Sequence, residues 1–315
     1  MSGVVLVTSR SFSSGEHDGA ARLREAGLRI VTAPHTHALD ELAELLPQAD
    51  AWIAGTGPVT EEHFALAPKL RIVARYGVGV DAVDVEAAAR RGVLVANTPA
   101  ANSESVAELA FVFALLGLRR IPRGDAALRR GDWSAIRGAG IEGRRVGVVG
   151  YGRIGRGFAR RAIALGASVS IFDPWLPEGA EGDDVTRVAE LAELASLDVV
   201  SLHSPGGETL VDAAWLARAD GLVLVNTARA DLVDEHAVAE ALRDGRLASY
   251  AADTLSTESA GGTSPLLAEE LRELTTFTPH LGAQTVQAID MMTRLSVDAV
   301  LDVVAGREPA HLVTV

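Results

Sequence analysis

The chain has 315 residues, which is long enough for one large domain or two ordinary ones, each with its own core. Hydrophobic residues make up 48% and charged residues 23%, a composition typical of a soluble globular protein. The net charge of −13 argues against a nucleic-acid partner, which requires a dense basic patch, and the absence of cysteine excludes disulfides, thiol catalysis and cysteine-ligated metals.

The N-terminal residues indicate a cytoplasmic protein. Residues 1–8 contain neither a basic leader nor a long apolar stretch, so we expect a first strand here and no signal peptide. The longest apolar segment, residues 106–118, is interrupted by Glu108 and is too short to span a bilayer. We therefore expect no membrane partner.

Short apolar runs alternate with amphipathic stretches along the whole chain. They predict strands at residues 4–7, 28–31, 51–53, 72–74 and 94–96, and a second series at 145–149, 169–172, 199–202, 222–225, 250–252 and 276–278. Strands that alternate with helices favour parallel sheets with helices on both faces. So many strands divide naturally into two sheets, and we expect an α/β fold with two doubly wound domains.

The boundary between the two domains is predicted near Thr98-Pro99, where a strand ends and a long helical region, residues 103–130, begins. A long amphipathic helix at residues 284–304 is expected to cross back to the first domain. The first domain, residues 1–98 and 284–315, would then be discontinuous, with residues 99–283 inserted as the second domain. A cleft between two α/β domains is where a small ligand and a cofactor would meet.

A glycine turn follows the strand at 145–149. Gly150, Gly152 and Gly155 precede a predicted helix at residues 153–165. The first glycine makes a tight turn, the second lets the backbone approach a pyrophosphate, and the third packs helix against strand. Asp173 ends the next strand, where a carboxylate binds the adenosine ribose hydroxyls and repels a 2′-phosphate. The alternative to a dinucleotide site is a tight turn followed by an acid that caps a helix. A strand, a helix and an acid in this order together favour a Rossmann domain, and the acid favours NAD over NADP.

Polar residues follow the later strands. Arg229 and Asp253 come directly after two of them, Glu258 lies in the next loop, and His280 follows the strand-like piece at 276–278. A guanidinium, two carboxylates and an imidazole downstream of a glycine turn indicate a site where a nicotinamide ring meets an oxygenated carbon. The alternatives are a salt bridge between Arg229 and Asp253 at a sheet edge and an ordinary turn at His280.

The chain resembles the NAD-dependent D-2-hydroxyacid dehydrogenases, the family that includes phosphoglycerate dehydrogenase. The resemblance covers essentially the whole chain, and the motifs that carry it are Arg-Tyr-Gly-Val-Gly-Val-Asp at residues 75–81, Asn-Thr-Pro at 97–99, Ser-Val-Ala-Glu at 105–108 and Val-Asn-Thr-Ala-Arg at 225–229. It implies a Rossmann cofactor domain inserted in a discontinuous, flavodoxin-like substrate domain. It also implies hydride transfer between NADH and a 2-oxo acid.

The resemblance implies a role for each polar residue, in agreement with its chemistry. His280 would be the general acid, with Glu258 favouring its protonated form and fixing its orientation. Arg229 would bind the substrate carboxylate and polarise the carbonyl, while Asp253 would accept the nicotinamide carboxamide. Further cofactor contacts are implied for Arg153, Ile154, His203, Pro205, Thr209, Thr227, Ala228 and Gly282, and substrate contacts for Arg75 and the backbone N–H groups of Val78 and Gly79.

The sequence departs from the family in three places that bear on the substrate and the site. The phosphoglycerate branch carries arginines for the substrate phosphate where this chain has residues 54–57, Ala-Gly-Thr-Gly, and Ser134-Ala135. The missing bidentate contacts predict a general 2-oxo acid dehydrogenase, such as a hydroxypyruvate or glyoxylate reductase, with phosphoglycerate as a second possibility. The other departure is Ser259, where the family usually has proline after the glutamate.

Other classes of protein fit less well. We expect no C-terminal regulatory domain, and an NAD-sensing binding protein on the same fold remains the alternative of another class. Formate dehydrogenase is disfavoured because Glu258 is present. The helical region at 103–133 resembles the family's dimerisation arm and predicts a homodimer. No metal is expected, because His35, His37 and Asp40 precede an amphipathic helix and favour capping and solvation.

Overall fold

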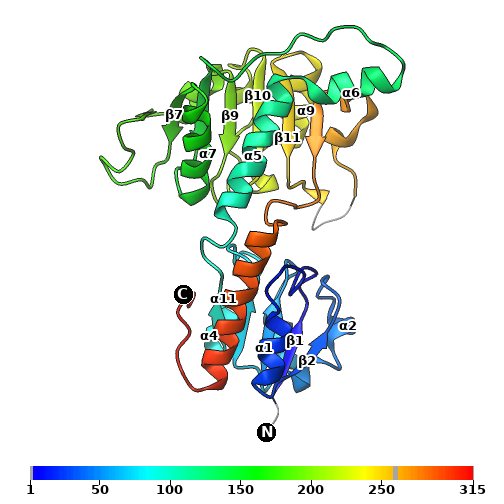
Figure 1. The fold of residues 1–315 in the computed structure, drawn as a ribbon, viewed down its shortest axis with the longest axis vertical. Coiled ribbons are helices and arrows are strands. Elements are labelled where there is room, and N and C mark those ends of the chain that lie inside the picture. The colour runs from blue at the N-terminus through cyan, green and yellow to red at the C-terminus, as the bar shows by residue number, and fades with distance from the viewer. Residues whose placement is uncertain (1–2, 258–261, 315) are drawn as a thin grey trace. The chain divides into compact units, whose positions relative to one another are not determined.

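The computed structural model describes residues 3–257 and 262–314. The chain divides into two compact units, Met1–Asn102 with Ala283–Val315 and Ser103–Gly282, which we call the first and second units (Figure 1). Each unit is built around one parallel sheet with helices on its faces. The predicted fold class, a doubly wound α/β domain inserted in a discontinuous one, is confirmed.

The first unit contains a sheet of five parallel strands in the order β2-β1-β3-β4-β5. Along the strands, alternate residues enter two different cores: Val5 and Val7 face one cluster, and Leu6 faces the other. The strands are β1 Val4–Val7, β2 Arg29–Thr32, β3 Ala51–Ala54, β4 Ile72–Arg75 and β5 Leu94–Ala96. The helices are α1 Gly19–Glu25, α2 Leu39–Leu42, α3 Glu61–Leu66, α4 Val85–Arg90 and α11 Val286–Val304, with the 3-10 turn η1 Leu46–Gln48.

Helix α11 belongs to the first unit although it follows the whole second unit in sequence. Its residues Ile289, Met292, Val297 and Val300 are buried in the same core as Val5. The helix begins at Val286, slightly after the predicted start, because the Thr285 side chain accepts a hydrogen bond from the Ala288 N–H and caps it.

The second unit contains a sheet of seven parallel strands in the order β12-β11-β10-β9-β6-β7-β8. The strands are β6 Arg145–Val149, β7 Ser168–Phe172, β8 Val185–Arg187, β9 Val199–Leu202, β10 Leu222–Asn226, β11 Leu247–Ala252 and β12 Thr275–Phe277. The helices are α5 Ser103–Leu118, α6 Ile121–Arg129, α7 Arg153–Ala164, α8 Ala213–Leu216 and α9 Glu235–Arg243. The 3-10 turns are η2 Leu191–Ser196, η3 Ala230–Leu232, η4 Pro265–Leu267 and η5 Glu269–Leu271.

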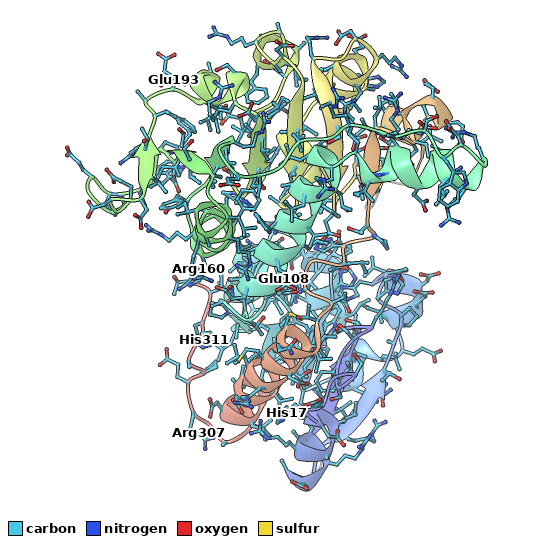
Figure 2. The ribbon with its side chains drawn as sticks, turned by 45° about the horizontal axis from the view of Figure 1, so that its top comes forward. His17, Glu108, Arg160, Glu193, Arg307 and His311 are labelled. Carbon is cyan, nitrogen blue, oxygen red and sulfur yellow. The ribbon has the colours of Figure 1, made fainter. Side chains whose placement is uncertain are left out.

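Helices α5 and α7 cover one face of the second sheet, while α8 and α9 cover the other. Figure 2 shows Glu108 on α5 and Arg160 on the neighbouring α7. The two helices are also joined by ion pairs, because Arg160 and Arg161 both contact Glu104 at 2.8 and 2.9 Å. The pairs are exposed, so the buried apolar contacts hold the helices together and the ion pairs add little.

The helical region predicted at 103–130 consists of two helices, α5 and α6. They are separated where Arg120 adopts a left-handed backbone with φ of 52° and Pro122 follows in the first turn of α6. The edge strand β8 was not predicted, since Val185 is its only apolar residue. Among the described residues, none of the helices has both the length and the apolar character needed to cross a membrane.

Candidate active site

The residues expected to bind the cofactor follow the carboxyl ends of six strands of the second unit. Because all strands of this sheet are parallel and their last residues are paired, from Phe172 on β7 to Phe277 on β12, these ends form one edge. The order of the strands reverses between β6 and β9, which puts the glycine turn at the topological switch point. Ligands of open α/β sheets bind at this point.

The three glycines of the turn have different surroundings. Gly150 has φ of 86°, and a Cβ there would lie 2.8 Å from the carbonyl carbon of His203. A Cβ at Gly155 would lie 2.1 Å from the Gly150 oxygen. The protein's own packing therefore requires both glycines. At Gly152, in contrast, a Cβ would meet none of the described atoms within 4 Å, so open space lies in front of this residue.

The first turn of α7 and Asp173 adjoin that space. Gly152 precedes α7, and Arg153 and Ile154 are its first residues. Asp173 is held by two backbone donors, since its oxygens accept from the Tyr151 N–H at 2.8 Å and the Trp175 N–H at 2.9 Å. A carboxylate has about four acceptor positions, so the donors of the described residues leave about two of them open.

His203 presents its backbone to the glycine turn and its ring to the core. Its N–H donates to the Val149 oxygen at 2.7 Å, and its ring lies 5.4 Å from that of Phe158. Within residues 3–257 and 262–314 neither ring nitrogen has a hydrogen-bond partner, and burial lowers the pKa of His203 to about 3. The ring is therefore neutral at physiological pH and acts as an apolar packing group.

The loops after β9 and β10 carry four other expected contacts. Pro205 and Thr209 are exposed, and the Thr209 hydroxyl donates to the Asp231 oxygen at 3.0 Å. Thr227 is buried, and in the described part of the chain its hydroxyl has no partner. Such an orphaned hydroxyl is costly unless a ligand satisfies it. Ala228 follows it, half-buried.

Asn226 shapes the loop that presents Arg229. This fully buried asparagine accepts from the Ala228 N–H at 3.0 Å and donates to the Arg229 oxygen at 2.8 Å. The Arg229 guanidinium itself is half-buried and contacts the Ala228 oxygen at 2.9 Å. Sequence reasoning quoted Asn226 only as part of a motif. Its role could have been recognised from its position at the end of an apolar strand. A buried amide without hydrogen-bond partners is unfavourable there, so partners in the following loop are expected.

Asp253 organises the loop that carries His280. Its side chain is 2% exposed and accepts hydrogen bonds from the Thr278 hydroxyl, the Leu281 N–H at 2.7 Å and the Gly282 N–H at 2.7 Å. Its backbone oxygen accepts from the His280 N–H at 3.0 Å.

This loop is conformationally restricted. His280 has φ of 54°, in the left-handed region that non-glycine residues rarely adopt. The Gly282 carbonyl is held in turn by the Ser105 hydroxyl at 2.6 Å. The hydrogen bonds to Asp253 therefore maintain an unfavourable backbone geometry at the expected general acid. Glu258, the expected partner of His280, lies outside the described residues.

The expected substrate contacts lie in the first unit. Arg75 ends β4, half-buried, and its guanidinium contacts the Tyr76 oxygen. The turn after it is held by Asn97, whose amide donates to the Val78 oxygen at 2.8 Å. In the portion of the chain that is described, the Val78 and Gly79 N–H groups donate to no backbone oxygen. Both residues are half-buried.

One expectation in the first unit was wrong. His37, expected to be solvated, is 1% exposed and packs against Trp52 with ring centroids 5.0 Å apart and the ring planes inclined by 50°. Its Nε2 accepts from the Thr8 hydroxyl at 2.6 Å, and its Nδ1 donates to the Pro58 oxygen at 3.1 Å. The Thr8 oxygen accepts in turn from the Trp52 indole at 2.9 Å. Burial lowers the pKa of His37 to about 4, which keeps the ring neutral.

A parallel sheet with a glycine turn at its switch point defines a dinucleotide-binding domain. Residues 111–282 match the family model described as "D-isomer specific 2-hydroxyacid dehydrogenase, NAD binding domain". The chain thus belongs to the D-isomer-specific 2-hydroxyacid dehydrogenases, a family of NAD-dependent oxidoreductases, and the resemblance inferred from its motifs is confirmed.

Relatives with different names share this architecture. The chain is 42% identical over 259 residues to D-3-phosphoglycerate dehydrogenase of Mycobacterium tuberculosis, matching 80% of this chain but 48% of that protein. It therefore spans about half the length of the phosphoglycerate dehydrogenases that it matches. It is 33% identical over 274 residues to hydroxypyruvate reductase of Thermotoga maritima, covering 82% of this chain and 85% of that one. The crystal structure of the TT0316 protein from Thermus thermophilus superposes with a TM-score of 0.88 at 33% identity, covering 99% of this chain and 100% of that one.

Proposed function

We propose that the protein transfers hydride between NADH and a 2-oxo acid, producing a D-2-hydroxy acid. The observation that carries this proposal is the single edge shared by the glycine turn, Arg229 and the strained loop of His280. If the nicotinamide ring binds beside that turn, the His280 imidazole and the Arg229 guanidinium would be carried by loops at the same edge of the sheet. Family membership supports the reaction class, and the local geometry is consistent with the proposed role of each residue.

The residues at this edge fit NAD, which supplies the hydride when bound. The open space at Gly152 and the N-terminus of α7 suit the pyrophosphate, and the free acceptor positions of Asp173 suit the adenosine ribose. The buried Thr227 hydroxyl requires a partner that the described residues do not offer. Asp253 already accepts from three donors, which leaves about one acceptor position for the nicotinamide carboxamide.

His280 would deliver the proton to the carbonyl oxygen. An opposite charge stabilises the protonated imidazole, and we propose that Glu258 provides that charge. Arg229 has a planar guanidinium that matches a carboxylate, and we propose that it binds the acid group of the substrate. We propose that the backbone N–H groups of Val78 and Gly79, with the Arg75 guanidinium, are further contacts of the substrate; among the described residues these two N–H groups donate to no backbone oxygen.

The substrate is proposed to be a small 2-oxo acid such as hydroxypyruvate or glyoxylate. The segment after β3, Gly55-Thr56-Gly57, has no basic side chain for a phosphate, and neither has Ser134-Ala135. Phosphoglycerate is retained as a second candidate, because the relatives at 42% identity carry that name.

A substrate panel tests both the reaction and the substrate. NADH oxidation would be measured with glyoxylate, hydroxypyruvate, pyruvate and phosphohydroxypyruvate. Turnover with the unphosphorylated acids supports the proposal, and a strong preference for phosphohydroxypyruvate supports the second candidate. NADH binding without turnover on any acid would refute an enzymatic role and favour a binding protein.

We also propose a homodimer formed through α5 and α6. Large apolar side chains are exposed along residues 103–133, and exposed apolar surface favours association. Exposed by 44 to 85%, they are Val112 on α5, Ile121 and Leu128 on α6, and Trp133 after α6. Sedimentation of the wild type and of Val112→Glu tests the proposal: we expect a dimer that the variant weakens, and a monomeric wild type would refute it.

A further inference from the structure

An exposed indole follows the carboxylate that is proposed to bind the adenosine ribose. Trp175 is 87% exposed, more than any other large apolar side chain of the described residues. Its neighbour Leu176, in contrast, packs against the core cluster that contains Phe158. The packing of the second unit therefore accounts for Leu176 but not for Trp175.

The backbone of Trp175 is held in a tight turn from Asp173 to Leu176. The Leu176 N–H closes the turn by donating to the Asp173 backbone oxygen at 3.4 Å, and Pro174 occupies its second position. Proline fixes its own φ near the value that this position requires. The same Asp173 oxygen also accepts from the Arg187 guanidinium at 3.0 Å. The indole is therefore attached to a backbone that is fixed beside Asp173.

The Asp173 carboxylate lies between the glycine turn and the backbone of Trp175. One of its oxygens accepts from the Tyr151 N–H at 2.8 Å, and the other accepts from the Trp175 N–H at 2.9 Å. In adenosine the base is bonded directly to the ribose. A ribose that binds to this carboxylate therefore brings its base close to the Trp175 side chain.

Tyr151, the other aromatic residue bonded to this carboxylate, offers less ring surface. It is 7% exposed, and the Arg156 guanidinium lies over its ring, 4.4 Å from the centroid. Arg156 also donates to the Ala180 oxygen at 2.7 Å, which ties the loop after Trp175 to α7. Of the two rings, the indole therefore has the accessible face, and an aromatic face is a favourable stacking surface for any base.

We propose that Trp175 binds the cofactor by stacking its indole on the adenine of NAD. This inference deepens the proposed function: it rests on the proposed place of the adenosine ribose at Asp173 and does not depend on turnover. Replacing an aromatic residue that stacks on a base weakens binding by about 5- to 150-fold. Ligands that contain adenosine should therefore lose affinity when the indole is removed.

The first test measures the Kd for NADH and for ADP-ribose by calorimetry in wild type and in Trp175→Ser. We expect both Kd values to rise by about tenfold, with the melting temperature without ligand unchanged because the side chain is exposed. Trp133→Ser is the matched control, since Trp133 is 85% exposed in the same unit, and its Kd values should equal those of wild type. Kd values in Trp175→Ser within about twofold of wild type would refute the inference.

Fluorescence gives a readout of the indole itself. The chain has four tryptophans, of which Trp52 and Trp215 are buried, so in Trp133→Phe quenching by acrylamide reports mainly on Trp175. Saturating ADP-ribose should protect the indole from acrylamide, whereas nicotinamide mononucleotide, which has no adenine, should not. Unchanged quenching with ADP-ribose would show that the indole stays in water and would overturn the inference. Protection by nicotinamide mononucleotide would contradict it as well, because another part of the cofactor would then cover the indole.

Failure of the proposed adenosine site has a different signature. Asp173→Ala should weaken NADH binding if the ribose lies at this carboxylate. If neither Asp173→Ala nor Trp175→Ser weakens it, the adenosine lies elsewhere and the inference falls with that assignment. If only Asp173→Ala weakens it, the ribose site stands and stacking on Trp175 is refuted. Turnover is not measured, so these results hold whichever 2-oxo acid is reduced.

Discussion

The interaction of Asp253 with the His280 loop can be tested by the nearly isosteric change Asp253→Asn. In wild type the two carboxylate oxygens accept from Thr278, Leu281 and Gly282. An amide has one oxygen, so in either orientation its NH₂ group faces a backbone N–H of the loop. Losing the charge and leaving a buried donor unsatisfied costs about 2–4 kcal/mol.

The cost should appear in both stability and activity. For a unit of this size, a loss of about 2–4 kcal/mol lowers the melting temperature by roughly 5–10 °C, measured by thermal unfolding without ligand. Because the left-handed backbone of His280 depends on these bonds, we also expect kcat to fall by about tenfold or more. Asp220→Asn is the control, since Asp220 is exposed, and its melting temperature should change little. Unchanged stability and unchanged turnover in Asp253→Asn would show that Asp253 does not organise this loop.

Three other outcomes are expected. His280→Asn should lower turnover by about 10²–10⁴-fold with NADH affinity kept, because asparagine tolerates the left-handed backbone; retained turnover, measured as NADH oxidation, would exclude His280 as the acid. Gly155→Ala should prevent stable folding, whereas Gly152→Ala should keep the wild-type melting temperature and weaken NADH binding; equal melting temperatures in the two variants would contradict the packing argument. His37 is neutral when folded, so its contribution is complete above about pH 6.5 and declines as the pH falls toward about 4. In urea unfolding, wild type should therefore lose roughly 2 kcal/mol more than His37→Gln between about pH 7.5 and about pH 5, and equal losses would contradict this assignment.

The sequence allowed most of the strands to be predicted because buried parallel strands are continuous apolar runs. The run at residues 199–202 is an example, and it matches β9. What could not be predicted lies where that signal is weak. Strand β8 has one apolar residue, and the break between α5 and α6 depends on a single residue, Arg120, with a left-handed backbone.

In the candidate site, the polar residues that follow strands could be predicted from the sequence. The residues that fix the surrounding loops by hydrogen bonds could not. Thr278 and Asn226 act through hydrogen bonds to side chains or backbone brought close by folding. His37 was misjudged for the same reason, because its ring packs against Trp52 on β3 and bonds to Thr8 just after β1. Such contacts leave no periodic pattern in one sequence.

The discontinuity of the first unit has a consequence for synthesis on the ribosome. Val5 and Val7 emerge early, but α11, which covers that face of the sheet, is translated only after the roughly 180 residues of the second unit. At about 5–20 residues per second, the nascent sheet waits for some 10–40 s with this apolar face covered only in part, by Leu23 of α1. The contiguous second unit, in contrast, can complete its own core during that interval. Chaperone dependence during translation should therefore concentrate on the amino-terminal hundred residues.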